Sequence, residues 1–266
     1  MNKTIVGTTI VKKSAYALNA FLANQKETQI KNQDTELIIA TDEIDFLGEL
    51  KEYLEKHKLK GEVIYYETEK PEYAKDNRIW SMTAGREAIR KYVLERRDVD
   101  WLLSVDADMV FDSNSINILK DKVNGRTVAQ SGYVLRDINT IGFSLGCTLI
   151  KREVLERIKF RCLEFKNGQV IEEGNMFEYD LIKQGIKIVK GLFLEIKHYY
   201  NNNDFVLTCS RQLPLSKLIS THSLLRYWLI GASILFKHDI SRAVFNIIYS
   251  NSFIQILKEI EGVESR

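Results

Sequence analysis

The chain has 266 residues, of which 45% are hydrophobic and 28% are charged, as expected for a globular protein with a substantial core. Its 38 basic and 36 acidic residues nearly cancel and leave a formal net charge of +2. Nucleic-acid-binding proteins are usually strongly basic, so no nucleic-acid partner is expected. The longest apolar stretch, residues 224–236, contains Arg226 and is too short to span a bilayer comfortably.

Strand-like and helical patterns alternate over the first 111 residues. Short apolar runs predict strands, and apolar residues at helical spacing between them predict helices. Such alternation indicates a mainly parallel sheet that is covered by helices on both faces, an α/β fold. In chain order the predicted elements are a strand at 5–11, a helix at 14–24, a strand at 36–42, a helix at 46–58, a strand at 62–66, a helix at 78–95 and a strand at 101–105.

The later part of the chain is less regular. It predicts strands at 128–135, 144–150, 186–189 and 192–198, and helices at 154–158 and 177–184, the second closed by Gly185. From residue 215 the chain looks helical to its end. We therefore expect a domain at residues 1–203, with halves at 1–112 and 113–203, and a helical C-terminal extension at 204–266.

Three cysteines lie too far apart for a short-spaced zinc motif: Cys147, Cys162 and Cys209. An odd number without a disulfide framework predicts buried, reduced thiols in a cytoplasmic protein. The N-terminus opens directly on a strand-like run, so no signal peptide is expected. Association with a membrane surface remains open.

Two acids follow the apolar run that ends at Val105. If the strand continues, Asp106 and Asp108 point to the same side, because strand side chains alternate. Converging carboxylates repel each other unless a cation lies between them, and their oxygen atoms suit Mg²⁺ or Mn²⁺ carrying a phosphate. The alternative is a polar turn in which residues 112–114 cap the next helix.

Five motifs occur in an order that resembles GT-A glycosyltransferases, in particular the Anp1-like and family-two-like nucleotide-sugar transferases. They are a helix at 78–86, the Asp-x-Asp strand at 100–110, a small-residue strand at 142–152, an acidic motif at 172–177 before Gly185, and His198. The resemblance covers roughly the first 200 residues and implies a Rossmann-like GT-A fold. It also implies transfer of a sugar from a nucleoside-diphosphate donor to a hydroxyl of an unidentified glycan, lipid or protein.

The resemblance implies a metal site that contains Mn²⁺ or Mg²⁺. It places Asp108 on the metal, Asp106 on the donor ribose or on the metal through water, and His198 as a further ligand. A divalent ion would neutralise the charge that develops on the diphosphate leaving group. The alternative for His198 is an ordinary, partly buried histidine.

Glu172 and Glu173 are candidates for the base that deprotonates the acceptor hydroxyl. The family usually has Glu-Asp here, and Gly174 stands where that Asp is expected, so a shift by one residue would place the base at Glu173. Inverting transfer is expected, with retaining transfer as the alternative. Both acids could equally be the solvated start of a helix.

Four further residues are expected to face the donor. Arg78 and Arg86 lie a little over two helical turns apart, so they can share a face, and a guanidinium suits a diphosphate. Thr8 lies at the end of the first strand and Asp42 after the second, where the family binds the nucleoside. For the two arginines, an ordinary position on the helix surface is the alternative.

Two other functions remain open. A sugar-phosphate nucleotidyltransferase would need a glycine-rich loop after the first strand, and residues 7–14 lack a glycine repeat. A noncatalytic nucleotide-sugar-binding protein would be expected to lose a metal acid, and both are present. The apolar residues of the extension must also be covered, and packing on the core, a homodimer or a peripheral membrane contact would each cover them; of these, packing on the core or in a homodimer is favoured.

Overall fold

The computed structural model describes residues 3–123, 126–134, 141–142, 145–164, 170–192 and 194–208. The chain divides into two compact units, Met1–Leu213 and Pro214–Arg266. The second unit lies outside the described residues, and so do the predicted helices of the extension. One correction is clear, because Phe205–Thr208 form a strand, β14, paired with β13. The residues that directly follow 204 therefore belong to the first unit.

The elements of the first unit follow the predicted alternation of strands and helices. In chain order they are β1 (Lys3–Thr9), η1 (Lys12–Ala17), α1 (Leu18–Lys31), β2 (Thr35–Thr41), α2 (Ile44–Lys56), β3 (Gly61–Tyr65), α3 (Asn77–Glu95), β4 (Val99–Val105), β5 (Met109–Phe111), α4 (Ser115–Val123), β6 (Val128–Ser131), β7 (Tyr133–Val134), β8 (Ile141–Gly142), β9 (Cys147–Lys151), α5 (Arg152–Arg157), β10 (Leu163–Glu164), β11 (Val170–Ile171), α6 (Glu173–Lys183), β12 (Ile188–Leu192), β13 (Ile196–Tyr199) and β14.

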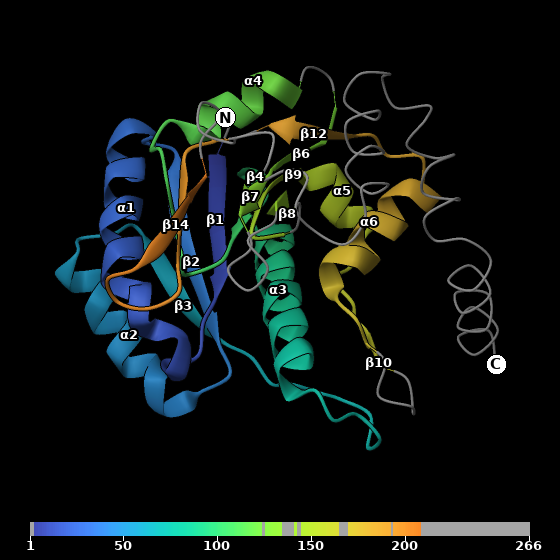
Figure 1. Ribbon diagram of the computed structural model, residues 1–266, viewed down its shortest axis with the longest axis horizontal. Helices are drawn as coiled ribbons and strands as arrows, with labels where there is room; N and C mark the ends of the chain where they lie inside the picture. The colour runs from blue at the N-terminus through green and yellow to red at the C-terminus, as the bar shows by residue number, and fades with distance from the viewer. Residues whose placement is uncertain are drawn as a thin grey trace. The chain divides into compact units, whose positions relative to one another are not determined.

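The central sheet has seven strands in the order β12-β6-β9-β4-β1-β2-β3. β4, β1, β2 and β3 are parallel neighbours, whereas β9 runs antiparallel to both β4 and β6. Helices cover both faces of the sheet (Figure 1), with α1, α2 and α4 on one face and α3, α5 and α6 on the other. The predicted mainly parallel, Rossmann-like α/β fold is confirmed.

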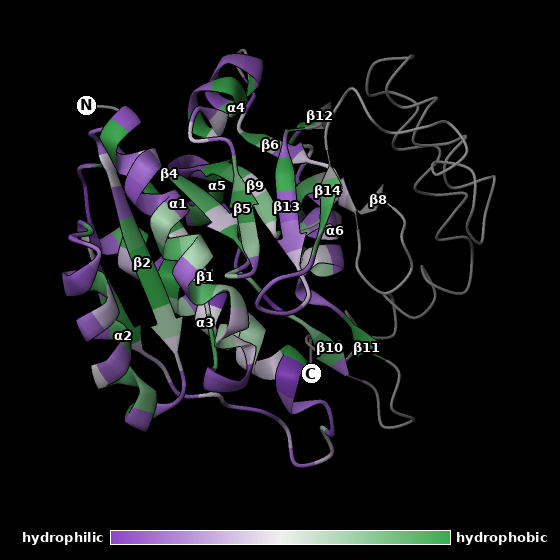
Figure 2. Ribbon diagram, turned by 60° about the vertical axis from the view of Figure 1, so that its left-hand side comes forward, coloured by the Kyte–Doolittle hydropathy of each residue, from purple (hydrophilic) through white to green (hydrophobic). Residues whose placement is uncertain are grey.

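Adjacent residues of each central strand pack on opposite sides of the sheet. Val6 and Leu103 pack with α1 and α2, whereas Ile5 and Leu102 pack with α3. Because both faces are buried, the central strands are mostly apolar at their middle residues and show no regular alternation with polar residues (Figure 2). Their carboxyl ends meet at one edge of the sheet, where parallel α/β proteins bind ligands.

A second, antiparallel sheet has the order β14-β13-β5 and extends from this edge. In its register His198 lies opposite Met109, and Ile196 lies opposite Phe111. The outer side of β5 is held by Asn24 of α1, whose amide donates to the carbonyl of Phe111 at 2.6 Å and accepts from its N–H at 3.2 Å. The pairing carries His198 from late in the chain to the residues that follow β4.

Candidate functional site

The two acids lie in a turn between β4 and β5. The N–H of Met109 donates to the carbonyl of Asp106 at 3.1 Å, and the N–H of Asp106 donates to the carbonyl of Gly146 at 3.2 Å. The strand therefore ends at Val105, and alternation along a strand does not determine the direction of either carboxylate. That part of the sequence argument is wrong, and the two acids have different partners.

Asp108 lies between η1 and β13. Its Oδ2 accepts a hydrogen bond of 2.8 Å from the hydroxyl of Tyr16, and its Oδ1 lies 3.6 Å from Nε2 of His198. The N–H of Tyr199 donates to the carbonyl of Asp108 at 2.8 Å, which extends the pairing of β5 with β13 to the turn. His198 and Asp108 are thereby held side by side.

The Asp108–His198 pair fits two ligands of one divalent cation. Adjacent ligands of an octahedral ion at about 2.1 Å lie about 3 Å apart, so a small closure from 3.6 Å suffices. Among the described residues no group of three or more histidine, cysteine or acidic side chains forms a metal cage. Mg²⁺ commonly takes one or two protein ligands and completes its shell with phosphate and water, and the pair suits that pattern.

Asp106 is paired with a buried arginine. A guanidinium nitrogen of Arg86 lies 2.6 Å from Oδ1 of Asp106, and its other terminal nitrogen contacts Oε1 of Glu173. The side chains of Arg86 and Glu173 are each 6% exposed, against 30% for Asp106. Arg86 therefore holds together two acids that come from the turn after β4 and from the start of α6.

Removing one member of a buried ion pair strands the other charge and typically costs about 3–5 kcal/mol. Loss of the Arg86 charge from this Asp106–Arg86–Glu173 triad would therefore leave two carboxylates, one of them buried, without their cationic partner. Arg86 was expected to face a diphosphate, and instead it binds two carboxylates. Arg78 is exposed near the start of α3, about 12 Å along the helix axis from Arg86, so the two arginines do not lie together.

The acidic pair before α6 is divided between solvent and the interior. Glu172 is exposed, and its carbonyl accepts from the N–H groups of Asn175 and Met176, both at 3.1 Å, in the first turn. Glu173 is buried against Arg86. The structure thus separates two residues that the sequence treats as near equivalents. Gly185 adopts a φ of +70° directly after the helix, as its predicted capping role requires.

Gly146 allows three groups to approach one another. A Cβ at this position would lie 2.5 Å from Oδ2 of Asp106, 2.5 Å from the hydroxyl of Tyr133 and 2.8 Å from the terminal methyl of Met109. The ring of Tyr133 meets the ring of His198 edge to face, with centroids 5.5 Å apart. Tyr133 therefore lies between the Asp106 triad and the Asp108–His198 pair.

The other predicted donor residues lie apart from this group. Thr8 is 1% exposed, and its hydroxyl is buried without a hydrogen-bond partner. Asp42 lies after β2 and accepts from the hydroxyl of Thr68 at 3.1 Å. Beside it, burial raises the pKa of Tyr66 to about 12, and the charge of Asp42 adds to this. Asp42 is thus on the edge where a nucleoside is expected, whereas Thr8 is enclosed.

Two of the three cysteines are free and buried, as predicted: Cys147 and Cys162. Burial, with a contribution from the charge of Asp106, raises the pKa of Cys147 to about 12. Its thiol therefore stays protonated at neutral pH and packs as a small apolar group. Cys209 lies outside the described residues.

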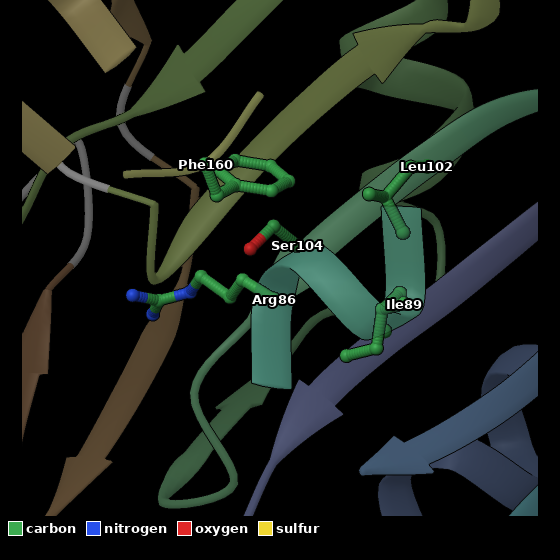
Figure 3. Close-up of a pocket in the computed structure, with 6 residues that line it drawn as sticks. Arg86, Ile89, Leu102, Ser104 and Phe160 are labelled. Atoms are coloured by element: carbon green, nitrogen blue, oxygen red, sulfur yellow. The ribbon is translucent and has the colours of Figure 1, made fainter. Parts of the chain in front are cut away.

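A small hollow lies beneath Arg86, between α3 and the sheet (Figure 3). It is lined by Gly7, Arg86, Ile89, Leu102, Ser104 and Phe160. The hollow has no room for a water molecule, so it is a packing gap rather than a substrate pocket. In Figure 3 the Arg86 side chain extends away from Ile89 and Leu102.

No protein-family model matches the sequence. No curated protein matches it either. Among solved structures, the mannosyltransferase PcManGT from Pyrobaculum calidifontis, in complex with GDP-Man and Mn²⁺, is similar with a TM-score of 0.51 and 14% identity over 71% of this chain and 55% of that one. TarS from S. aureus is similar with a TM-score of 0.51 and 11% identity over 95% of this chain and 43% of that one. The chain has a GT-A-like fold.

The GT-A-like fold is what this likeness shows, because identities of 11–14% do not carry function from one protein to another. The chain spans about half the length of the mannosyltransferase and of TarS. A 4-diphosphocytidyl-2C-methyl-D-erythritol synthase from Anaerococcus prevotii is less similar, with a TM-score of 0.46 and 11% identity over 82% of this chain and 95% of that one. Among the described residues of the GT-A-like unit, no helix is long and apolar enough to cross a membrane.

Two residues of this edge were missed by the sequence argument, Tyr16 and Tyr133, and so was the pairing of Arg86 with two carboxylates. A tyrosine in a short helix after the first strand carries no pattern that distinguishes it from other surface tyrosines. Arg86 could have been suspected, because a helix face that packs on a sheet seldom carries an unpaired charge.

Proposed function

We propose that the protein is a metal-dependent glycosyltransferase that moves a sugar from a nucleoside-diphosphate donor to an acceptor hydroxyl. The observation that carries the proposal is the pairing of Asp108 with His198 at 3.6 Å, beside Asp106, at the carboxyl edge of a GT-A-like sheet. The similar mannosyltransferase was solved with GDP-Man and Mn²⁺, which supports a donor and a metal of these classes.

Asp108 and His198 would hold Mn²⁺ or Mg²⁺, which when bound supplies positive charge to the diphosphate leaving group. Asp106 is fixed by Arg86 and lies beside this pair, where its outer oxygen could reach the donor ribose or a metal-bound water. Asp42, half-exposed after β2, is suited to accept a hydrogen bond from the nucleoside. Thr8 is enclosed and Arg78 is exposed near the start of α3, away from this cluster, so neither is assigned a contact with the donor.

Glu173 is the better candidate for the base, because it lies in the same cluster as Asp106, whereas Glu172 faces solvent. In an inverting transfer the acceptor O–H would lose its proton to the Glu173 carboxylate as the acceptor oxygen bonds to the anomeric carbon. The bond from that carbon to the diphosphate breaks, and its electron pair leaves with the diphosphate. Arg86 contacts Glu173 and would orient its carboxylate, which makes Arg86 a positioning residue in this proposal.

Donor hydrolysis tests the proposal, because slow hydrolysis needs no known acceptor. We expect release of a nucleoside diphosphate from one member of a panel of nucleotide sugars, and this release should require Mn²⁺ or Mg²⁺. Asp108→Asn should abolish it, whereas the exposed Glu172→Gln should retain it. Release of pyrophosphate from a nucleoside triphosphate and a sugar phosphate would instead show a nucleotidyltransferase.

Binding distinguishes a transferase from a protein that only binds nucleotide sugars. A ligand that binds the folded state raises its melting temperature, so donor and Mn²⁺ together should raise it more than either alone if they bind as one unit. A shift in the absence of any hydrolysis or transfer would contradict the catalytic proposal.

A further inference from the structure

We propose that Tyr16 is a positioning residue that sets the spacing of Asp108 and His198 for a shared divalent cation. The inference rests on the proposed function, because it concerns the same metal. Tyr16 lies in η1, directly after the first strand, and no motif of the sequence marks it. Its hydroxyl lies 2.8 Å from Oδ2 of Asp108 and 3.3 Å from the carbonyl oxygen of Tyr199.

The hydroxyl of Tyr16 connects three parts of the chain that must meet for the metal to bind. It reaches the side chain of Asp108 and, on β13, the carbonyl of the residue that follows His198. In addition, the N–H of Tyr199 donates a hydrogen bond of 2.8 Å to the carbonyl of Asp108. Asp108 is therefore bonded to η1 through its side chain and to β13, next to His198, through its backbone.

The two oxygens of the Asp108 carboxylate have different neighbours. Tyr16 binds Oδ2, whereas Oδ1 lies 3.6 Å from Nε2 of His198. A phenol has one proton, and the carboxylate is both the nearer and the stronger acceptor. The hydrogen bond therefore turns Oδ1 toward His198, at the place where a cation would bridge the two.

The physical consequence is preorganisation. The terminal torsion of an aspartate is broad, so a carboxylate without an outer partner samples many orientations. Loss of a residue that orients a metal ligand typically lowers metal affinity by about 10–100-fold. Tyr16 should have an effect of this size on Mn²⁺ binding, although it does not contact the ion.

Tyr16→Phe tests the inference, because it removes the hydroxyl and keeps the ring. We expect the Kd for Mn²⁺ alone, measured by electron paramagnetic resonance, to rise by about 10–100-fold. Turnover should recover at saturating Mn²⁺, because both metal ligands are intact. A loss of kcat that Mn²⁺ does not restore would overturn the inference.

Tyr92→Phe is the matched control. The Tyr92 hydroxyl also donates to a carboxylate, that of Glu62 at 3.0 Å, but it lies six residues beyond Arg86 along α3, and its other partner is Arg96 at the amino edge of the sheet. This variant should leave the Kd for Mn²⁺ unchanged. Equal Mn²⁺ affinity in wild type, Tyr92→Phe and Tyr16→Phe would overturn the role of Tyr16 and leave the proposed function standing.

Two further outcomes are informative. If wild-type protein fails to bind Mn²⁺, both with and without a nucleoside diphosphate, the metal assignment falls and the inference falls with it. If Tyr16→Phe does not fold, wild-type protein with ¹³C-labelled tyrosine rings replaces it. Mn²⁺ should then broaden the resonance of Tyr16 before that of Tyr92, and the reverse order would overturn the inference.

Discussion

Arg86 joins two acids that play separate parts in the proposed reaction. Asp106 follows β4 and is 30% exposed, whereas Glu173 begins α6 and is 6% exposed. The guanidinium is planar and rigid, and its two terminal nitrogens each bind one of the carboxylates, so it fixes their relative position more tightly than a flexible lysine would. One side chain of α3 thereby sets the distance between the donor side and the acceptor side of the candidate site.

Glu173→Gln should lower turnover by about 10²–10⁴-fold, the usual loss for a missing general base. The glutamine oxygen can still accept a hydrogen bond from Arg86, so donor affinity should change little. Steady-state kinetics, with donor affinity measured separately by calorimetry, separates the two effects.

Glu172→Gln is the control, because it makes the same change one residue away on an exposed side chain. Its turnover should match that of wild type. Full turnover in Glu173→Gln would remove Glu173 as the base and favour a retaining mechanism.

At the scale of the elements, β5 helps to bring Asp108 and His198 together. It pairs with β13 on one side and is hydrogen-bonded to Asn24 of α1 on the other. β5 has only three residues, and β13 pairs with one of its sides. On the other side, the buried Asn24 holds both backbone groups of Phe111. This short strand is therefore fixed by partners that come from distant parts of the chain.

Asn24→Ala should lower the free energy of unfolding by roughly 2–4 kcal/mol, because it leaves a buried N–H and a buried carbonyl of Phe111 without their side-chain partner. It should also weaken Mn²⁺ binding, because β5 carries the turn that contains Asp108. Urea denaturation and Mn²⁺ titration measure the two effects. Asn117→Ala, an exposed change in α4, should alter neither, and a loss below about 1 kcal/mol in Asn24→Ala would contradict the prediction.

The sequence predicted the main strands and helices well, because strands buried on both faces leave long apolar runs. The helix closed by Gly185 also has the predicted cap, although it begins at Glu173 and therefore earlier than expected. Elements of two or three residues, such as β5 and β10, were missed because their pairing, and not their composition, makes them strands.

The site was predicted less completely than the fold. Asp106, Asp108, Glu173 and His198 do meet at one edge, but their partners could not be read from spacing. The Arg86 triad depends on how α3 and α6 pack on the sheet, and the role of Tyr16 depends on a pairing between β5 and β13. Spacing also did not predict that Thr8 is enclosed, because the last residues of a parallel strand can face the core as easily as the ligand edge.

At the scale of the whole molecule, the two edges of the sheet are stabilised differently. The amino edge carries an ion cluster of Lys3, Glu36, Arg96 and Asp98, with contacts of 2.5–3.0 Å. Hydrogen bonds from Arg96 and Lys3 lower the pKa of Asp98. For Glu36, burial alone would raise the pKa, but the bonds from Arg96 and Lys3 outweigh it and lower the value.

Stability should fall in acid through these two carboxylates. Their pKa values are lower in the folded state than in the unfolded chain, so the folded state binds fewer protons. Their contribution is complete above about pH 5 and is lost as the pH falls through the folded values. The double variant Glu36→Gln, Asp98→Asn should therefore show a shallower fall of melting temperature between about pH 5 and pH 3, measured by circular dichroism. An unchanged slope would contradict this prediction.

The sheet also separates the candidate site into two parts with different structural neighbours. Tyr16, Asp108 and His198 belong to elements that pack with α1, whereas Arg86 and Glu173 belong to α3 and α6 on the opposite face. On the proposed function, the first group would serve the donor and the second the acceptor. Substitutions in α6 that spare Glu173 leave the Asp106–Arg86 pair and the hydrogen bond from Tyr16 to Asp108 intact, so they can change the acceptor side alone. A laboratory selection for new acceptors should therefore accumulate its changes around α6 and leave η1 and β13 intact.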